Sequence, residues 1–120
     1  IKEKKTLELW GNGKVKREFL NVKDLADAIY FVLIKKIKND YINVGGGDHI
    51  SIKELALLIK KTIGYKGEIN FNKNYPDGVK RRRIDSSIMN KIGWKPNIRL
   101  DDGIKEYCKY YQEKVLLYEK

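Results

Sequence analysis

The sequence has one cysteine, one histidine, one methionine and no long hydrophobic run. A single cysteine, Cys108, excludes an internal disulfide, as expected for a protein of a reducing compartment. His49 stands alone, and no group of His, Cys and carboxylate residues has metal-ligand spacing, so the sequence does not predict a metal site. The longest apolar run, residues 28–34, is far shorter than the roughly 20 residues that a membrane span needs.

The first residues contain no apolar segment of the signal-peptide type. They are Ile-Lys-Glu-Lys-Lys, a charged stretch that does not start with methionine. We therefore expect a cytoplasmic protein, and a chain that is one piece of a longer polypeptide. Its 120 residues suffice for a single small core.

The chain carries a formal net charge of +10. Such a charge indicates an acidic partner, which could be nucleic acid, a membrane surface or a phosphorylated small molecule. The positive charge is mostly lysine and is spread through the whole chain, so a general compositional bias accounts for much of it. Charge alone does not choose among the three partners.

Local sequence patterns predict a small mixed α/β fold. Residues 5–10 and 16–22 have strand-like patterns, and the turn signal Gly-Asn-Gly between them predicts a hairpin. Because no linker or repeat interrupts the chain, residues 1–120 are interpreted as one domain. Further strands are expected at 40–44 and 68–71, and helices at 24–36, 51–64, 86–92 and 101–117.

The first candidate site is formed by Trp10 and Arg17, which the expected hairpin would place across a short turn. An indole face and a guanidinium suit a nucleotide diphosphate, because the ring packs against base or ribose and the fork binds phosphate oxygens. The alternative is a core tryptophan and a solvated arginine.

The second candidate site is the loop 75–83, which contains Tyr-Pro-Asp-Gly-Val followed by four consecutive cations. Pro76 and Gly78 fit the second and fourth places of a type I β-turn, which would fix the Asp77 carboxylate on a stiff loop. An anion-binding site that also has one carboxylate to accept hydrogen bonds from ligand hydroxyls would have this composition. A solvated basic loop and a nucleic-acid contact remain alternatives.

Two other motifs carry less chemical information. Residues 43–47 end in three glycines that could present amides to a phosphate, but the spacing is not that of a dinucleotide-binding loop, and a tight connection is favoured. Tyr110 and Lys114 have the Tyr-x-x-x-Lys spacing of a reductase acid/base pair, yet no cofactor loop is near them in the sequence. We therefore interpret this pair as non-catalytic.

Several motifs resemble, in order, those of one enzyme family. Residues 17–28 are similar to the Arg-Glu-Phe-(Ile/Leu)-x-Val-Asp-Asp-(Leu/Met)-Ala-x-Ala signature of extended short-chain dehydrogenases/reductases. Pro-Asp-Gly at 76–78 narrows the resemblance, because it is similar to the Lys-Pro-Asp-Gly-Thr-Pro-Arg-Lys loop of GDP-L-fucose synthases, which act on GDP-4-keto-6-deoxy-mannose. The similarity continues at 42–45, 52–56, 63–67 and 92–96.

The resemblance implies that this chain is the C-terminal substrate-binding part of such an enzyme, without its Rossmann half. It implies that Arg17 binds the diphosphate, that Asp77 accepts hydrogen bonds from ribose hydroxyls and that Trp10 flanks the nucleotide. Arg81 aligns with the arginine of the family loop and would assist at phosphate. The catalytic residues and the NADP site would lie upstream of Ile1, so no catalytic, cofactor-binding or metal-binding residue is expected in this chain.

The loop also departs from the family pattern. Tyr75, Val79 and Lys80 replace Lys, Thr and Pro, and Lys23 replaces the first Asp of the Val-Asp-Asp run. These changes leave the sugar open, and a sister reductase acting on another GDP-4-keto-deoxy sugar, such as a heptose derivative, is an alternative.

Our interpretation is the substrate-binding domain of an NADP-dependent GDP-4-keto-6-deoxy-sugar epimerase/reductase of nucleotide-sugar biosynthesis. Its expected partners are a GDP-sugar, the missing N-terminal Rossmann domain and, in the full-length enzyme, a second subunit of a homodimer. Nucleic acid and membrane are not expected partners. Two alternatives remain: part of a UDP- or dTDP-sugar epimerase or dehydratase, and a basic nucleic-acid-binding module that uses residues 80–83.

Overall fold

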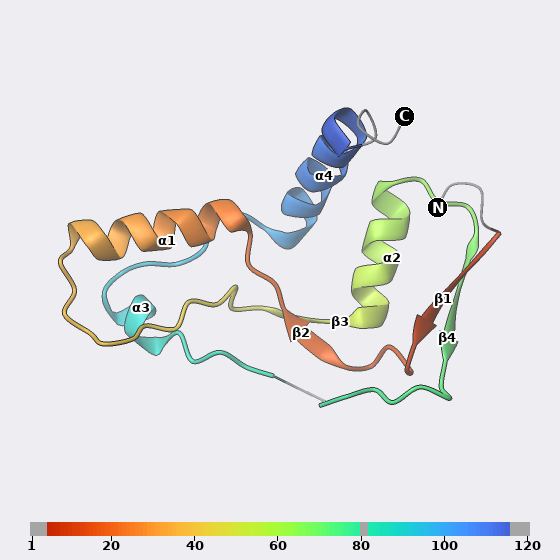
Figure 1. Cartoon of the computed structure of the whole chain (residues 1–120), viewed down its shortest axis with the longest axis horizontal. Helices are drawn as coiled ribbons and strands as arrows, with labels where there is room; N and C mark the ends of the chain where they lie inside the picture. The colour runs from red at the N-terminus through yellow and green to blue at the C-terminus, as the bar shows by residue number, and fades with distance from the viewer. Residues whose placement is uncertain (1–4, 80–81, 116–120) are drawn as a thin grey trace.

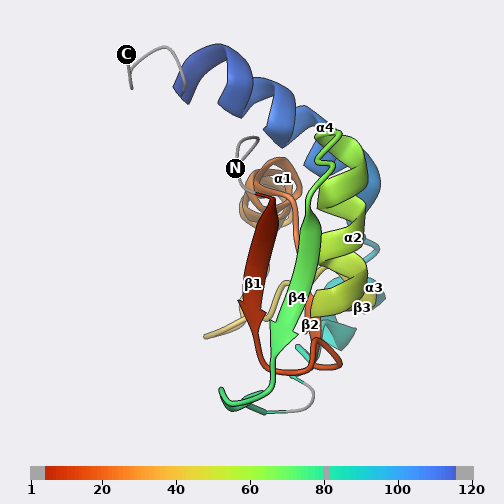
Figure 2. The same cartoon turned by 90° about the vertical axis from the view of Figure 1, so that its right-hand side faces the viewer.

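The computed structural model describes residues 5–79 and 82–115, which form a flat, elongated body of 52 × 35 × 20 Å. Figure 1 shows α1 and α3 at one end, α2 with β1 and β4 at the other, and β2 and β3 between them. In Figure 2 the two strands β1 and β4 run side by side in front of α2. The elements are, in order, β1 (Thr6–Trp10), β2 (Lys16–Glu18), α1 (Val22–Ile34), β3 (His49–Ser51), α2 (Ile52–Thr62), β4 (Glu68–Asn72), α3 (Ser87–Lys91), α4 (Leu100–Tyr110) and the π-helical turn η1 (Tyr111–Val115).

The predicted hairpin between residues 5–10 and 16–22 is wrong. β1 pairs with β4 in parallel, and β2 pairs with β3 antiparallel, so the two strands belong to separate two-stranded sheets. The backbone groups of the turn between them form hydrogen bonds with other segments of the chain. The Gly11 amide donates to the Asn72 carbonyl at 2.9 Å, and the Gly13 carbonyl accepts from the Lys53 amide at 2.9 Å. These bonds direct the chain from one sheet to the other.

The helices with strong local signals form where the sequence predicts them. α1 begins after Asn21, whose side chain accepts a hydrogen bond from the Lys23 amide at 2.9 Å. α2 begins after Ser51 with the predicted capping box, in which Ser51 and Glu54 exchange side-chain to backbone hydrogen bonds. The short helix α3 and the strand β4 also match their predicted positions to within one or two residues.

The capping box of α2 gives a testable stability prediction. Replacing Ser51 with alanine leaves a first-turn amide without its acceptor, so the free energy of unfolding should fall by about 1 kcal/mol. Hydrogen bonds from the Ser51 side chain and backbone hold the pKa of Glu54 below its ordinary value. This contribution is therefore present above the ordinary carboxyl pKa and is lost as the pH falls through the lowered value. Urea unfolding at neutral pH measures the loss, and Ser86→Ala is the control, because Ser86 is the N-cap of α3 and its side chain makes no cap hydrogen bond. An S51A midpoint equal to that of the native chain would contradict the prediction.

Two other predictions of secondary structure are wrong. Residues 40–44 form no strand, because no described segment of the chain pairs with them. The last helix is regular only as far as Tyr110 and continues as η1, so the expected helix over 101–117 changes its hydrogen-bonding pattern before its end. Residues 116 and 117 of that prediction lie outside the described residues.

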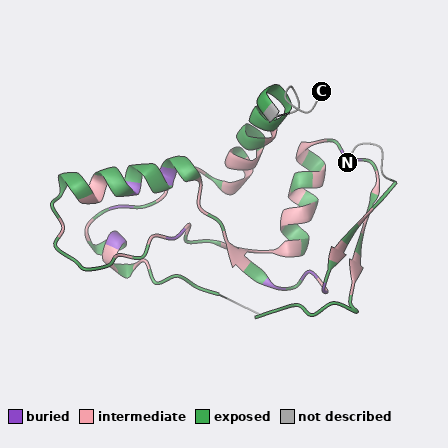
Figure 3. Cartoon of the chain, viewed as in Figure 1, coloured by how far each residue is buried: buried purple, intermediate pink, exposed green. Residues whose placement is uncertain are grey.

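The buried core is small and lies between α1 and α3. Ala28, Met89 and Trp94 are buried together, and Figure 3 shows how few residues are buried elsewhere. Asp24 is also buried there, where its carboxylate accepts hydrogen bonds from the Asn97 and Ile98 amides at 3.1 and 3.0 Å. These bonds join α1 to the segment that leads into α4.

The chain exposes more surface than an independent domain of its size. Its accessible surface is 9825 Å², whereas a compact monomer of this mass exposes roughly 6,700 Å². Its radius of gyration is 17.4 Å, compared with about 13.6 Å for a compact domain of this length. Among the described residues, no helix is long and apolar enough to cross a membrane.

Candidate functional site

The loop that follows β4 lies along the end of β1 and the turn after it. The Trp10 and Tyr75 rings stack with their centroids 4.3 Å apart and their planes at 10°. The Asn12 amides, from both backbone and side chain, donate to the two carboxylate oxygens of Asp77. Arg17 Nη1 donates to the Val79 carbonyl at 2.9 Å. We call this set of contacts, between residues 10–17 and residues 75–79, the contact edge.

Three of the four sequence-predicted substrate-binding residues lie on the contact edge. Trp10, Arg17 and Asp77 each contact the opposite segment of the chain there. They come together through the loop after β4, although the hairpin expected to join the first two does not form. The fourth residue, Arg81, lies outside the described residues.

Asp77 is held in a different way from the predicted type I turn. The tight turn lies earlier, where the Tyr75 amide donates to the Asn72 carbonyl at 3.4 Å, and residues 76–79 are irregular. Asn12 orients the carboxylate instead, and Gly11 makes its approach possible. Gly11 has φ 82°, and a Cβ there would overlap the Asp77 carboxylate. A rigid carboxylate results, with lone pairs beyond those that Asn12 uses.

Arg17 is half-buried, and its guanidinium is fixed by hydrogen bonds from one nitrogen, Nη1. Nη1 donates to the carbonyls of Lys16 and Val79 at 2.8 and 2.9 Å. Within the described ranges, Nε and Nη2 donate to no protein acceptor. A guanidinium fixed at one nitrogen with the remaining donors available is suited to binding an anion such as a diphosphate.

The glycine triplet packs around the end of β2. Glu18 accepts from the Gly47 amide at 2.7 Å with one carboxylate oxygen and from the Ile84 amide at 3.3 Å with the other. A Cβ on Gly45 would overlap the Glu18 carboxylate, and one on Gly46 would overlap the Phe19 carbonyl. The triplet is therefore the tight connection that the sequence favours. The Gly47 amide, which a phosphate bound at the triplet would need, already donates its hydrogen bond to the Glu18 carboxylate.

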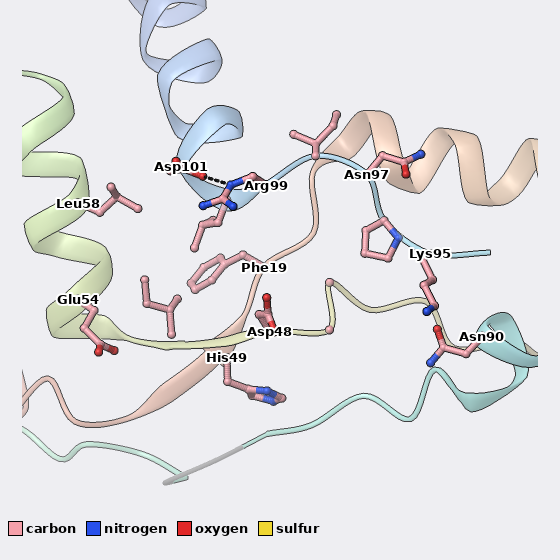
Figure 4. A pocket seen from close by; sticks show the side chains of 16 residues that line it. Phe19, Asp48, His49, Glu54, Leu58, Asn90, Lys95, Asn97, Arg99 and Asp101 are labelled. Atoms are coloured by element: carbon pink, nitrogen blue, oxygen red, sulfur yellow. Dashed lines mark hydrogen bonds and ion pairs between the residues drawn. The ribbon is translucent and has the colours of Figure 1, made fainter. Parts of the chain in front are cut away.

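A surface hollow of about 830 Å³ lies away from the contact edge and includes none of its residues. Figure 4 shows it between the base of α2, the start of α4 and the segment after β2, with charges of both signs on its walls. One ion pair there joins Arg99 Nε to Asp101 at 3.1 Å and holds the pKa of Asp101 below its ordinary value. Labelled wall residues are Phe19, Asp48, His49, Glu54, Leu58, Asn90, Lys95, Asn97, Arg99 and Asp101.

The remaining motifs form no site among the described residues. Tyr110 and Lys114 are exposed at the junction of α4 and η1, where the Tyr-x-x-x-Lys spacing is only a helical neighbour relation. Cys108 is a half-buried free thiol. The described part of the chain contains no cluster of three metal-ligating side chains.

Comparison with known proteins identifies the family. The NAD dependent epimerase/dehydratase family matches residues 1–45. Over 112 residues, the chain is 41% identical to a probable GDP-L-fucose synthase 1 of Oryza sativa subsp. japonica, covering 93% of this chain and 34% of that protein. The chain belongs to the NAD dependent epimerase/dehydratase family. This confirms the family resemblance seen in the sequence motifs.

Other members of the family are similar over the same extent. A GDP-L-colitose synthase of Yersinia pseudotuberculosis is 37% identical, covering 90% of this chain and 35% of that protein. The crystal structure of a GDP-6-OMe-4-keto-L-xylo-heptose reductase from C. jejuni superposes with a TM-score of 0.81 at 39% identity, covering 92% of this chain and 34% of that one. The chain thus spans about a third of the length of these relatives, and it forms a small α/β part of their fold.

Sequence reasoning missed three residues of this region. Asn12, Tyr75 and Glu18 each contact a segment more than 25 positions away in the sequence. A signal existed for Asn12, because a short amide side chain between two glycines can reach a neighbouring loop. Lys23 stands where the family pattern has Asp. The structure explains this difference, because the Lys23 ammonium group pairs with Glu106 on α4.

Proposed function

We propose that this chain is the C-terminal, substrate-binding part of an NADP-dependent GDP-4-keto-6-deoxy-sugar epimerase/reductase. The observation that carries the proposal is the order of groups along the contact edge: an aromatic stack at residues 10 and 75, a carboxylate at 77 and a guanidinium at 17 beside residue 79. Base, ribose and diphosphate follow one another in the same order in a GDP-sugar.

Each group suits one part of that ligand. An aromatic face stacks on a base, the Asp77 carboxylate accepts hydrogen bonds from ribose hydroxyls, and Arg17 binds the diphosphate through its remaining donors. Arg81 is proposed to assist at phosphate. By holding the nucleotide at one end, this part would orient the sugar toward the reacting groups of the complete enzyme.

We propose that this chain does not provide the cofactor site. It lacks a glycine-rich turn between a strand and a helix, and in its glycine triplet the Gly47 amide already donates to Glu18. The NADP of the complete enzyme, and its catalytic residues, are therefore proposed to belong to a Rossmann domain outside this chain.

The exposed surface of α1 supports a larger enzyme. Val22, Leu25, Ile29 and Leu33 recur at helical spacing on one face, and all four are exposed. Together with the excess of accessible surface, this apolar stripe is suited to packing against further polypeptide. We propose that the Rossmann domain covers it, and that the complete enzyme is a cytoplasmic homodimer.

Binding and turnover measurements test the proposal separately. In calorimetry, the full-length protein that contains this chain should bind GDP more tightly than UDP or dTDP. With NADPH and GDP-4-keto-6-deoxy-mannose or another GDP-4-keto-deoxy sugar, it should consume the cofactor, whereas the 120-residue chain alone should not. A preference for UDP or dTDP would instead support another nucleotide-sugar epimerase or dehydratase. Salt-sensitive binding to any DNA duplex, without nucleotide binding, would indicate a nucleic-acid-binding module.

A further inference from the structure

The stack of Tyr75 on Trp10 is unusual because both rings remain in solvent. Trp10 is 68% exposed and Tyr75 40%, although the two rings stack nearly parallel with their centroids 4.3 Å apart. Rings that pack for stability are normally covered by other side chains. Here a large part of both residues stays uncovered, so aromatic surface is left open beside the loop that holds Asp77.

The position of the stack relates it to the other groups of the contact edge. Trp10 is the last residue of β1, and the loop residues 75, 77 and 79 contact residues 10, 12 and 17 in turn. The exposed rings therefore lie beyond Asp77 on the side away from Arg17. A nucleotide with its phosphates at Arg17 and its ribose at Asp77 would bring its base to the rings.

We propose that Trp10 and Tyr75 together form a stacking platform for a purine base, and that Tyr75 is a residue that selects purine over pyrimidine nucleotides. This inference rests on the proposed function and deepens it. Stacking a base on an aromatic side chain contributes about 1–3 kcal/mol, and the two-ring purine overlaps an aromatic platform more extensively than a pyrimidine does. Tyr75 stands where GDP-L-fucose synthases have Lys, so the platform is a feature of this chain.

The variants Tyr75→Phe and Tyr75→Ala in the full-length protein test the platform by calorimetry with GDP and UDP. Y75F keeps the ring and should leave both Kd values unchanged. Y75A should raise the Kd for GDP about tenfold and that for UDP by a smaller factor, so that the preference for GDP shrinks.

A purely structural role for Tyr75 predicts a different result for Y75A. If Tyr75 only fastens the loop, Y75A weakens GDP and UDP by the same factor, and the preference for GDP stays constant. That result, or equal binding by all variants, would overturn the platform. If the unmutated protein fails to bind GDP, the proposed function is overturned as well. This outcome is seen without any variant, so it is distinct from a failure of the platform alone.

Intrinsic fluorescence gives an independent reading of the same contact. Trp94 is 4% exposed and donates from Nε1 to Asp27 at 2.8 Å, so it is shielded from a ligand that reaches Trp10. GDP should quench the tryptophan emission of the full-length protein, and Trp10→Phe should reduce this quenching. Quenching of the same size in W10F as in the unmutated protein would overturn the platform.

Discussion

Replacing Arg17 with alanine in the full-length protein is expected to raise the Kd for GDP about fiftyfold. Arg17 is the one described cation of the contact edge that the loop fixes in place, through the hydrogen bond from Nη1 to the Val79 carbonyl. A hydrogen bond to a charged group contributes about 1.5–3 kcal/mol, so the loss of one such bond to the diphosphate corresponds to a change in Kd of about fiftyfold. Isothermal titration calorimetry measures the change.

Two further variants separate the fork of Arg17 from its charge. Arg17→Lys keeps the charge but not the planar fork, so it should recover only part of the affinity. Lys14→Ala removes an exposed cation three positions away, and GDP affinity should change by less than about threefold, because the ammonium contribution of a solvated lysine is small. Equal losses in R17A and K14A would show that only net charge matters, and the diphosphate role of Arg17 would be wrong.

Replacing Gly46 with alanine is expected to destabilise the fold by about 3 kcal/mol or more. A Cβ at this position would overlap the Phe19 carbonyl oxygen, which is backbone and cannot rotate away. Relief of the overlap would require the connection between α1 and β3 to separate from the end of β2, and overpacking of this kind costs about 1–3 kcal/mol or occasionally more. Urea unfolding of the full-length protein, followed with soluble yield, measures the effect.

Gly47→Ala is the matched control for this prediction. Gly47 has φ 84°, but a Cβ there would meet nothing within 4 Å. The substitution therefore costs only the left-handed backbone penalty of about 1–2 kcal/mol. If G46A were as stable as G47A, this would contradict the claim that Gly46 packs too closely against Phe19 to accept a Cβ.

Elements with local signals could be predicted from the sequence. The capping box of α2, the apolar spacing of α1 and the glycine after α3 act within a few residues, so they specify their helices without tertiary information. The hairpin and the 40–44 strand failed because strand pairing depends on distant partners. The amides and carbonyls at the turn after β1 bind β4 and α2, which the turn signal alone does not reveal.

The candidate site was predicted in part for the same reason. Trp10, Arg17 and Asp77 were identified because they stand in motifs that resemble a family, and the structure brings all three to the contact edge. Their ligand roles remain proposals. Asn12 and Tyr75 were missed because their contacts span about sixty-five positions of sequence, and a single sequence carries no local pattern for such pairs.

Hydrogen–deuterium exchange of the full-length protein, with and without GDP, tests most directly whether the contact edge is the nucleotide site. We expect GDP to slow amide exchange in residues 10–17 and 72–79, with little change around the large hollow at 46–50 and 95–101. Protection confined to the hollow, with unchanged exchange along the edge, would contradict the proposed site.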